Sequence, residues 1–198
     1  ACVAVVLLAT APSAVAGDDR AERIAKVKAA YLLNFIRFAE WPDDAFADPN
    51  APIVVAVLGE DPMGAALDRT MAGRTVRGRP IVVRRYGLAD RADHADGAAH
   101  TDAMRQTAGQ LRRVHLLLMG SDVASDAAWF ARSLRDEPVL TVGAGRAFVE
   151  QPLMLSLVRR ANRIVFYADV RAIQRSPVKL SSQVLRLARI EDEIARDR

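Results

Sequence analysis

The chain has 198 residues, a formal net charge of +4, 51% hydrophobic and 26% charged residues, and one cysteine. This length and composition fit one globular domain with a single core, and they exclude a disordered or collagen-like chain. One cysteine cannot form a disulfide framework or a cysteine-rich zinc site, and a mean hydropathy of +0.05 is too polar for a polytopic membrane protein.

The first 16 residues carry no charge and end in the small-residue motif Ala14-Val15-Ala16. This pattern predicts the apolar part of a secretory signal peptide, without its basic n-region, that is cleaved after Ala16. A membrane anchor or a buried N-terminal helix is the alternative, but spanning needs about 20 apolar residues and Pro12 interrupts the run. We therefore expect an exported protein with one domain over residues 17–198 and, since Cys2 lies in the leader, a mature chain without cysteine.

Apolar periodicity divides the rest of the chain into helices and strands. In the first half, the predicted elements are a helix from Asp18 to Trp41 ended by Pro42, a buried strand over 53–58, a short helix over 63–71 and a strand over 81–86. In the second half, they are a weak helix or irregular segment near 104–111, strands over 114–119 and 139–142, a helix over 124–134, a β-hairpin of 153–158 and 164–168, and a helix over 179–194.

Four buried-type strands separated by helical or crossover-length segments, followed by a hairpin and a helix, predict an α/β fold. The expected architecture is a three-layer α/β/α sandwich with a mixed, mostly parallel sheet. Ligands of such sheets bind outside the carboxyl ends of the parallel strands. The candidate ligand residues at this edge are Glu60, Asp61, Ser121 and Asp122, with Arg146 and Arg163 as candidates for holding an anion. The alternative is that these turns only join strands to helices.

Motifs for catalysis or cofactor binding are missing or incomplete. Gly143-Ala144-Gly145 begins a dinucleotide-binding pattern, but Phe148 stands where its third glycine is needed. His94, His100 and nearby aspartates are candidate metal ligands, yet the H-x5-H spacing fits no helix face and favours a solvated acidic loop. We therefore expect no enzymatic activity, no cofactor and no metal.

Two helices are candidates for a partner surface, because aromatic residues and arginine are favoured at interfaces. The predicted partner or dimer contacts are Tyr31, Phe35, Phe38, Trp41, Lys179, Ser181 and Ser182. Core packing is the alternative for the aromatic stripe. The arginine pairs 84–85, 112–113 and 159–160 are suited to holding a phosphate, but such pairs more often flank strands as solvated residues.

Three blocks of the chain together resemble the YfiR family of exported bacterial regulators: KAAYLLNFIRFAEWP at 28–42, VLTVG at 139–143, and NRIVF at 162–166 leading to KLSSQVLRLA at 179–188. The resemblance covers residues 25 to 190. It implies a periplasmic α/β/α sandwich, commonly dimeric and without catalytic activity. It further implies binding to the periplasmic sensor domain of an inner-membrane diguanylate cyclase, which is held inactive, so that cyclic di-GMP, exopolysaccharide and biofilm output fall. The alternative function is periplasmic binding of a small anionic solute or nucleotide.

The chain departs from this family at two points. Family members often carry a cysteine at the start of the third strand, where this chain has Val114, so the disulfide-dependent redox control that the resemblance suggests is not expected here. Where the family often has Gly-Gly-Met before the hairpin, this chain has Gln151-Pro152-Leu153-Met154, and Pro152 removes a backbone donor. Because the protein is expected to be exported, its excess of arginine indicates binding to acidic protein or membrane surfaces, and no nucleic-acid partner is expected.

Overall fold

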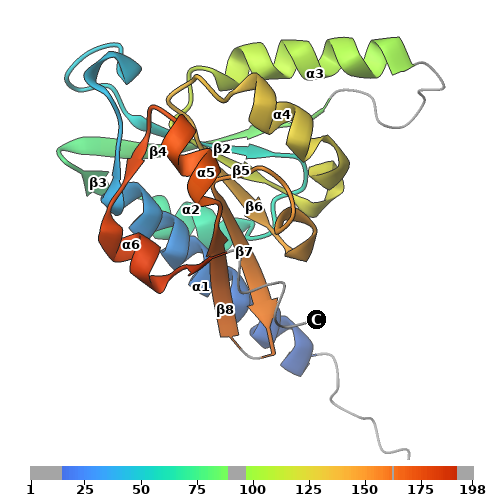
Figure 1. Ribbon diagram of the computed structural model, residues 1–198. Coiled ribbons are helices and arrows are strands. Elements are labelled where there is room, and N and C mark those ends of the chain that lie inside the picture. Colours follow the sequence, from blue (N-terminus) through green and yellow to red (C-terminus); the bar gives the residue numbers. More distant parts are fainter. Residues whose placement is uncertain (1–14, 89–96, 162, 191–198) are drawn as a thin grey trace, which may run out of the picture.

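A computed structural model of the chain describes residues 15–88, 97–161 and 163–190 (Figure 1). Most of the predicted leader, residues 1–14, lies outside the described residues. So do His94 and its neighbours Asp93 and Asp96 in the candidate metal loop, and the part of the predicted last helix that follows Ile190.

The centre of the molecule is a sheet of eight strands in the order β10-β8-β7-β6-β5-β2-β4-β3. These strands are β2 (Ile53–Leu58), β3 (Thr75–Val76), β4 (Arg79–Tyr86), β5 (Leu116–Met119), β6 (Leu140–Ala144), β7 (Leu155–Arg160), β8 (Arg163–Ala168) and β10 (Arg189–Ile190). The pairs β4–β2, β2–β5, β5–β6, β6–β7 and β8–β10 are parallel. The pairs β7–β8 and β3–β4 are antiparallel. The predicted mixed, mostly parallel sheet is confirmed.

Helices cover both faces of this sheet, which confirms the predicted three-layer sandwich (Figure 1). They are α1 (Val15–Phe38), α2 (Ala65–Met71), α3 (Gly97–Leu111), α4 (Ala127–Ser133), α5 (Val170–Arg175) and α6 (Ser182–Leu187), with short 3-10 turns η1 (Asp43–Ala45), η2 (Ser121–Asp126) and η3 (Arg146–Phe148). Val55 and Val57 of β2 face α1 and α2, and Val54, Ala56 and Leu58 face α3 and α4. Both faces of β2 are therefore buried, which is why its sequence is a continuous apolar run.

The first helix ends three residues earlier than its apolar periodicity predicts. The chain leaves the helix at Phe38 and forms β1 (Ala39–Glu40), which pairs antiparallel with β9 (Lys179–Leu180) in a separate two-stranded sheet. Pro42 contributes to this early end, because a proline disfavours helical geometry in the residue before it, here Trp41.

The predicted C-terminal helix over 179–194 is present but wrong in extent. The structure divides this segment into β9, a six-residue helix α6 capped by Ser181, and β10, which pairs with the end of β8. Leu187 is 77% exposed although it lies at an apolar position of the predicted helix. The helix stops there because Ala188 is extended and leads into β10.

The predicted β-hairpin is confirmed, with Arg160 of β7 paired to Arg163 of β8 across a two-residue turn. Ala161 in this turn has a φ of 50°, the left-handed geometry that two-residue hairpin turns require. Figure 1 shows the hairpin extending beyond the rest of the sheet, beside the first turns of α1. This placement forms the candidate site described next.

Candidate functional site: an arginine-lined groove

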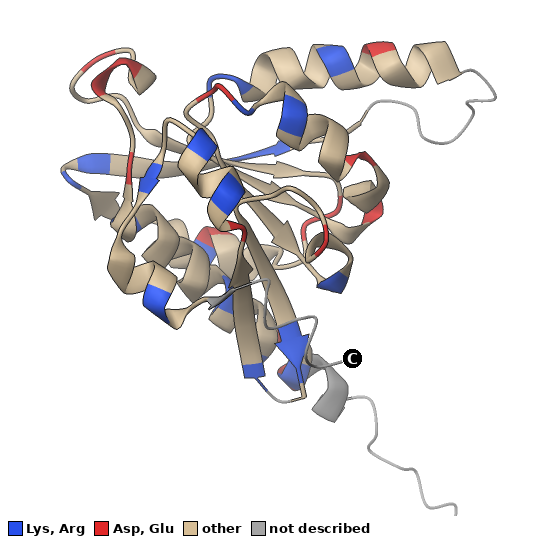
Figure 2. Ribbon diagram, viewed as in Figure 1, with Lys and Arg blue, Asp and Glu red and all other residues tan. Residues whose placement is uncertain are grey.

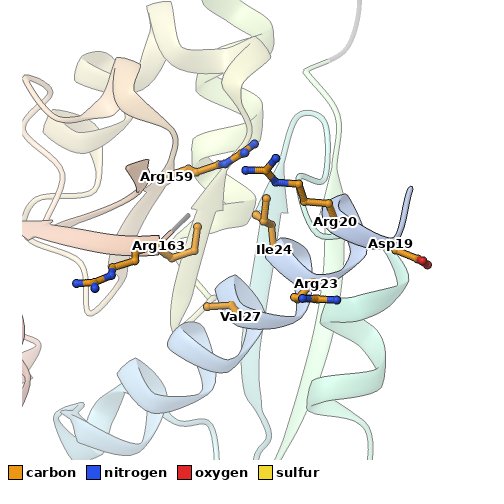
Figure 3. A pocket seen from close by; sticks show the side chains of 8 residues that line it. Asp19, Arg20, Arg23, Ile24, Val27, Arg159 and Arg163 are labelled. Atoms are coloured by element: carbon orange, nitrogen blue, oxygen red, sulfur yellow. The ribbon is translucent and has the colours of Figure 1, made fainter. Parts of the chain in front are cut away.

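The β7–β8 hairpin and the first half of α1 enclose a groove with a volume of about 530 Å³ (Figure 3). Helix α1 contributes Asp19, Arg20, Arg23, Ile24 and Val27, and the hairpin contributes Arg159, Arg163 and Ile164. Four of these eight side chains are arginines and one is an acid. We call this site the α1–hairpin groove.

Helical spacing brings the α1 side chains of the groove to one face. Arg20, Arg23, Ile24 and Val27 lie at positions i, i+3, i+4 and i+7, which repeat along one side of an α-helix. In Figure 3, Arg20 and Arg159 point toward one another above Ile24, while Arg23 and Arg163 extend to opposite sides. The cations therefore surround an apolar floor instead of converging on a single point.

An aromatic cluster fixes the hairpin against α1. The Tyr31 hydroxyl donates to the Ile164 carbonyl at 3.3 Å, and the Phe166 ring of β8 lies 5.7 Å from the Tyr31 ring and 5.1 Å from the Phe35 ring. Phe35 is 1% exposed. It belongs to the core and offers no surface to a partner in this structure, whereas Tyr31 and Phe38 are half-buried.

Two further cations, Lys28 and Arg160, lie next to the arginines that line the groove. Burial and the neighbouring Arg159 charge lower the pKa of the Lys28 ammonium below its ordinary value. Arg160 and Arg163 face each other across the hairpin, where like charges repel. Figure 2 shows basic residues, in blue, at the free end of the hairpin ribbon.

The turns predicted to form a ligand edge are Gly59-Glu60-Asp61, Gly120-Ser121-Asp122 and Gly143-Ala144-Gly145. The first two lie side by side, after β2 and β5. Asp122 joins them, because its Oδ1 accepts from the Glu60 N–H at 2.9 Å. A Cβ built on Gly59 would lie 2.5 Å from the same oxygen, and one on Gly120 would lie 2.1 Å from the Glu60 carbonyl oxygen. The Asp122 carboxylate thus fills the space over the Gly59 turn, where the sheet topology would place a ligand.

Asp61 stabilises the turn that precedes α2. Its Oδ1 accepts from the N–H groups of Met63 and Gly64 at 2.8 and 2.9 Å, and its Oδ2 pairs with Arg85 at 2.7 Å. Asp61 therefore closes the turn before α2, and Gly64 lies directly before the helix. Both carboxylate oxygens of Asp61 are thus engaged by groups of the protein itself.

The remaining predicted site residues lie apart along the chain. Ser121 is exposed at the start of η2, Arg146 is exposed at the start of η3, and Arg163 is exposed in the α1–hairpin groove. Lys179 is exposed in β9. Ser182 begins α6 beside its capping residue Ser181, whose hydroxyl accepts from the Gln183 N–H. A partner or ligand role for these residues stays a prediction.

A second cluster surrounds His115, at the amino end of β5. The imidazole Nδ1 accepts from the Val54 N–H at 3.0 Å, its ring stacks on Phe46 at 4.4 Å, and the Trp41 indole N–H donates to the His115 carbonyl at 3.0 Å. Burial lowers the pKa of His115 to about 4; the Arg79 charge acts in the same direction and the Ala45 carbonyl opposes both. Trp41, a predicted partner contact, thus also anchors the loop over His115.

The sequence indicated two cations of the α1–hairpin groove: Arg163 as a candidate for an anion, and Arg159 within the arginine pair 159–160. It did not indicate Arg20 and Arg23, for which the i, i+3 spacing on one helix was the available signal. Within the described residues, no three histidine, cysteine or acidic side chains come together to hold a metal ion. The described helices include none that is long and apolar enough to cross a membrane.

Comparison with known proteins gave one clear match. A family model described as YfiR/HmsC-like matches residues 25–189, from the third turn of α1 to the start of β10. A search of curated proteins found no match. The match covers the same part of the chain as the resemblance seen in its sequence.

Proposed function

Since the chain belongs to the YfiR/HmsC-like family, we propose that it is a non-enzymatic periplasmic regulator that binds an inner-membrane diguanylate cyclase and represses it. This family consists of exported regulatory proteins, and the match over residues 25–189 is the observation that carries the proposal. In this function, the protein binds the sensor domain of the cyclase and lowers cyclic di-GMP, exopolysaccharide and biofilm output. It acts as a homodimer without cofactor or metal.

Three measurements test this function. Deleting the gene should raise cellular cyclic di-GMP, and restoring it should return the level to that of the parent. The purified mature protein should also bind the purified periplasmic domain of a cyclase encoded beside it, and light scattering should give the mass of a dimer. Unchanged cyclic di-GMP after deletion would contradict repression of a cyclase, even with the fold correct.

Export requires the leader, which we propose is removed after Ala16. Cell fractionation should place the protein in the periplasm, and the mass of the intact periplasmic protein should correspond to a chain that begins at Gly17. Retention of the leader residues in the membrane fraction would contradict this step alone.

Binding of a small anionic solute is the second function predicted from the sequence. It is supported less well, because the Asp122 carboxylate fills the predicted ligand edge and would repel an anion there. A thermal-shift screen of anionic metabolites distinguishes the two functions, since a ligand at 100 times its dissociation constant stabilises the folded state by about 2.7 kcal/mol.

A further inference from the structure

The α1–hairpin groove combines an apolar floor with a cationic rim. Ile24, Val27 and Ile164 line the floor, and Val27 is 41% exposed. Arg23 and Arg163 are exposed on the rim. Such a surface suits a ligand that has both apolar and negatively charged groups.

Three cations of the groove, Arg23, Arg159 and Arg163, are without an acidic partner in the part of the chain that the structure describes. Elsewhere, Arg85 pairs with Asp61 and Asp68, and Arg69 pairs with Glu22. The hydrogen bond of Arg159 involves no acid: its Nε donates to the Ala161 carbonyl at 3.2 Å.

We propose that the α1–hairpin groove is the docking site for an acidic segment of the partner protein, whose carboxylates pair with the arginine rim while an apolar side chain covers Ile24 and Val27. This inference rests on the proposed function and names the part of the molecule that performs it. The binding energy comes from burial of the apolar floor, and the charges provide orientation and fast association.

The arrangement of the cations favours a polypeptide over a small anion. Arg23 and Arg163 extend to opposite sides of the groove, so one phosphate or carboxylate cannot contact both (Figure 3). The opening has a volume of about 530 Å³, larger than a simple oxyanion needs, and its two walls come from different elements. An extended segment with several acidic residues reaches cations on both walls.

Charge reversal at the rim tests the proposal directly. In the full mature chain, Arg23→Glu combined with Arg163→Glu should weaken binding to the periplasmic domain of the cyclase by about tenfold or more and reduce its dependence on salt. The matched control combines Arg135→Glu with Arg171→Glu, two exposed arginines outside the groove. It changes the net charge equally and should alter the affinity by less than about twofold.

A third variant, Val27→Ser, keeps every charge and tests the apolar floor. It should weaken binding several-fold while leaving the salt dependence of the wild type unchanged. Circular dichroism and thermal unfolding of all variants should match the wild type, because the replaced side chains are exposed. Cyclic di-GMP in cells should rise with the rim variant and stay low with the control.

The outcomes separate the two proposals. If the wild-type chain binds the cyclase domain and the rim variant binds equally well, the docking site is wrong and the proposed function stands. If the wild-type chain neither binds the domain nor lowers cyclic di-GMP, both fail. Groove-dependent binding of inorganic phosphate, of phosphatidylglycerol vesicles or of a second copy of the chain, with binding of the cyclase domain unaffected by the rim variant, would also overturn the proposal.

Discussion

His115 is buried at the start of β5, with 4% of its surface exposed, and it is uncharged in the folded protein at neutral pH. The unfolded chain binds a proton at the ordinary histidine pKa of about 6.5, whereas the folded protein binds it only near a pKa of about 4. Between these values the unfolded state holds more protons, so acid favours unfolding. The contribution of His115 to stability is therefore complete above pH 6.5 and is lost progressively as the pH falls toward 4.

The expected loss from this residue is about 3 kcal/mol at pH 4. Urea unfolding at a series of pH values measures it. His115→Gln offers the Val54 N–H an amide oxygen but does not titrate, so its free energy of unfolding should decline less between pH 6.5 and 4. An equal decline in both proteins would assign the acid sensitivity to other groups.

Ala161 at the hairpin turn has a φ of 50°, which is strained for a residue with a Cβ. Glycine adopts this geometry freely, so Ala161→Gly should raise the free energy of unfolding by about 0.5–1 kcal/mol. Ala30→Gly, at an exposed position inside α1, is the matched control and should lower it by about 1 kcal/mol. Urea unfolding compares the two, and destabilisation by Ala161→Gly would contradict the left-handed geometry.

At the scale of elements, the turn before α2 depends on one carboxylate. Asp61→Ala removes the acceptor for two N–H groups and one of the two acidic partners of Arg85, so we expect a loss of about 1–2 kcal/mol in the free energy of unfolding. Glu60→Ala, next to it, removes an exposed side chain and should change stability by less than about 0.5 kcal/mol. Equal effects on chemical unfolding would mean that Asp61 does not stabilise this turn.

The elements that sequence patterns predicted well are those that tertiary contacts bury completely. All six residues of β2 are buried, so its apolar run has one interpretation. The last helix was predicted too long because Val184 and Leu187 share helical spacing. Of these two residues, Val184 is buried in the core and Leu187 is exposed. Helix α3 gave a weak signal because Met104, Thr107, Ala108 and Leu111 are its only buried residues.

The candidate site depends on contacts that no local pattern reports. The Tyr31 hydroxyl and the Ile164 carbonyl that join the walls of the groove are 133 residues apart. Arg163 was predicted as a ligand residue from its charge alone. The helical arginines became candidates only after the hairpin was seen to lie beside α1, because their exposed positions resemble those of any solvated helix face.

At the scale of the whole molecule, the proposed removal of the leader would decide the redox chemistry of the mature protein. The single cysteine of the chain, Cys2, lies in the predicted leader, so a chain that begins at Gly17 has no thiol. The mature protein should therefore show the same melting temperature with and without a reducing agent, and its repression of cyclic di-GMP should not respond to thiol oxidants. Cleavage after Ala16 would also move the N-terminal ammonium to Gly17, two residues before Asp19, which lines the α1–hairpin groove. Acetylating that amine in the purified protein should thus weaken partner binding slightly at low salt and leave it unchanged at high salt, where charges separated by more than a few ångströms are screened.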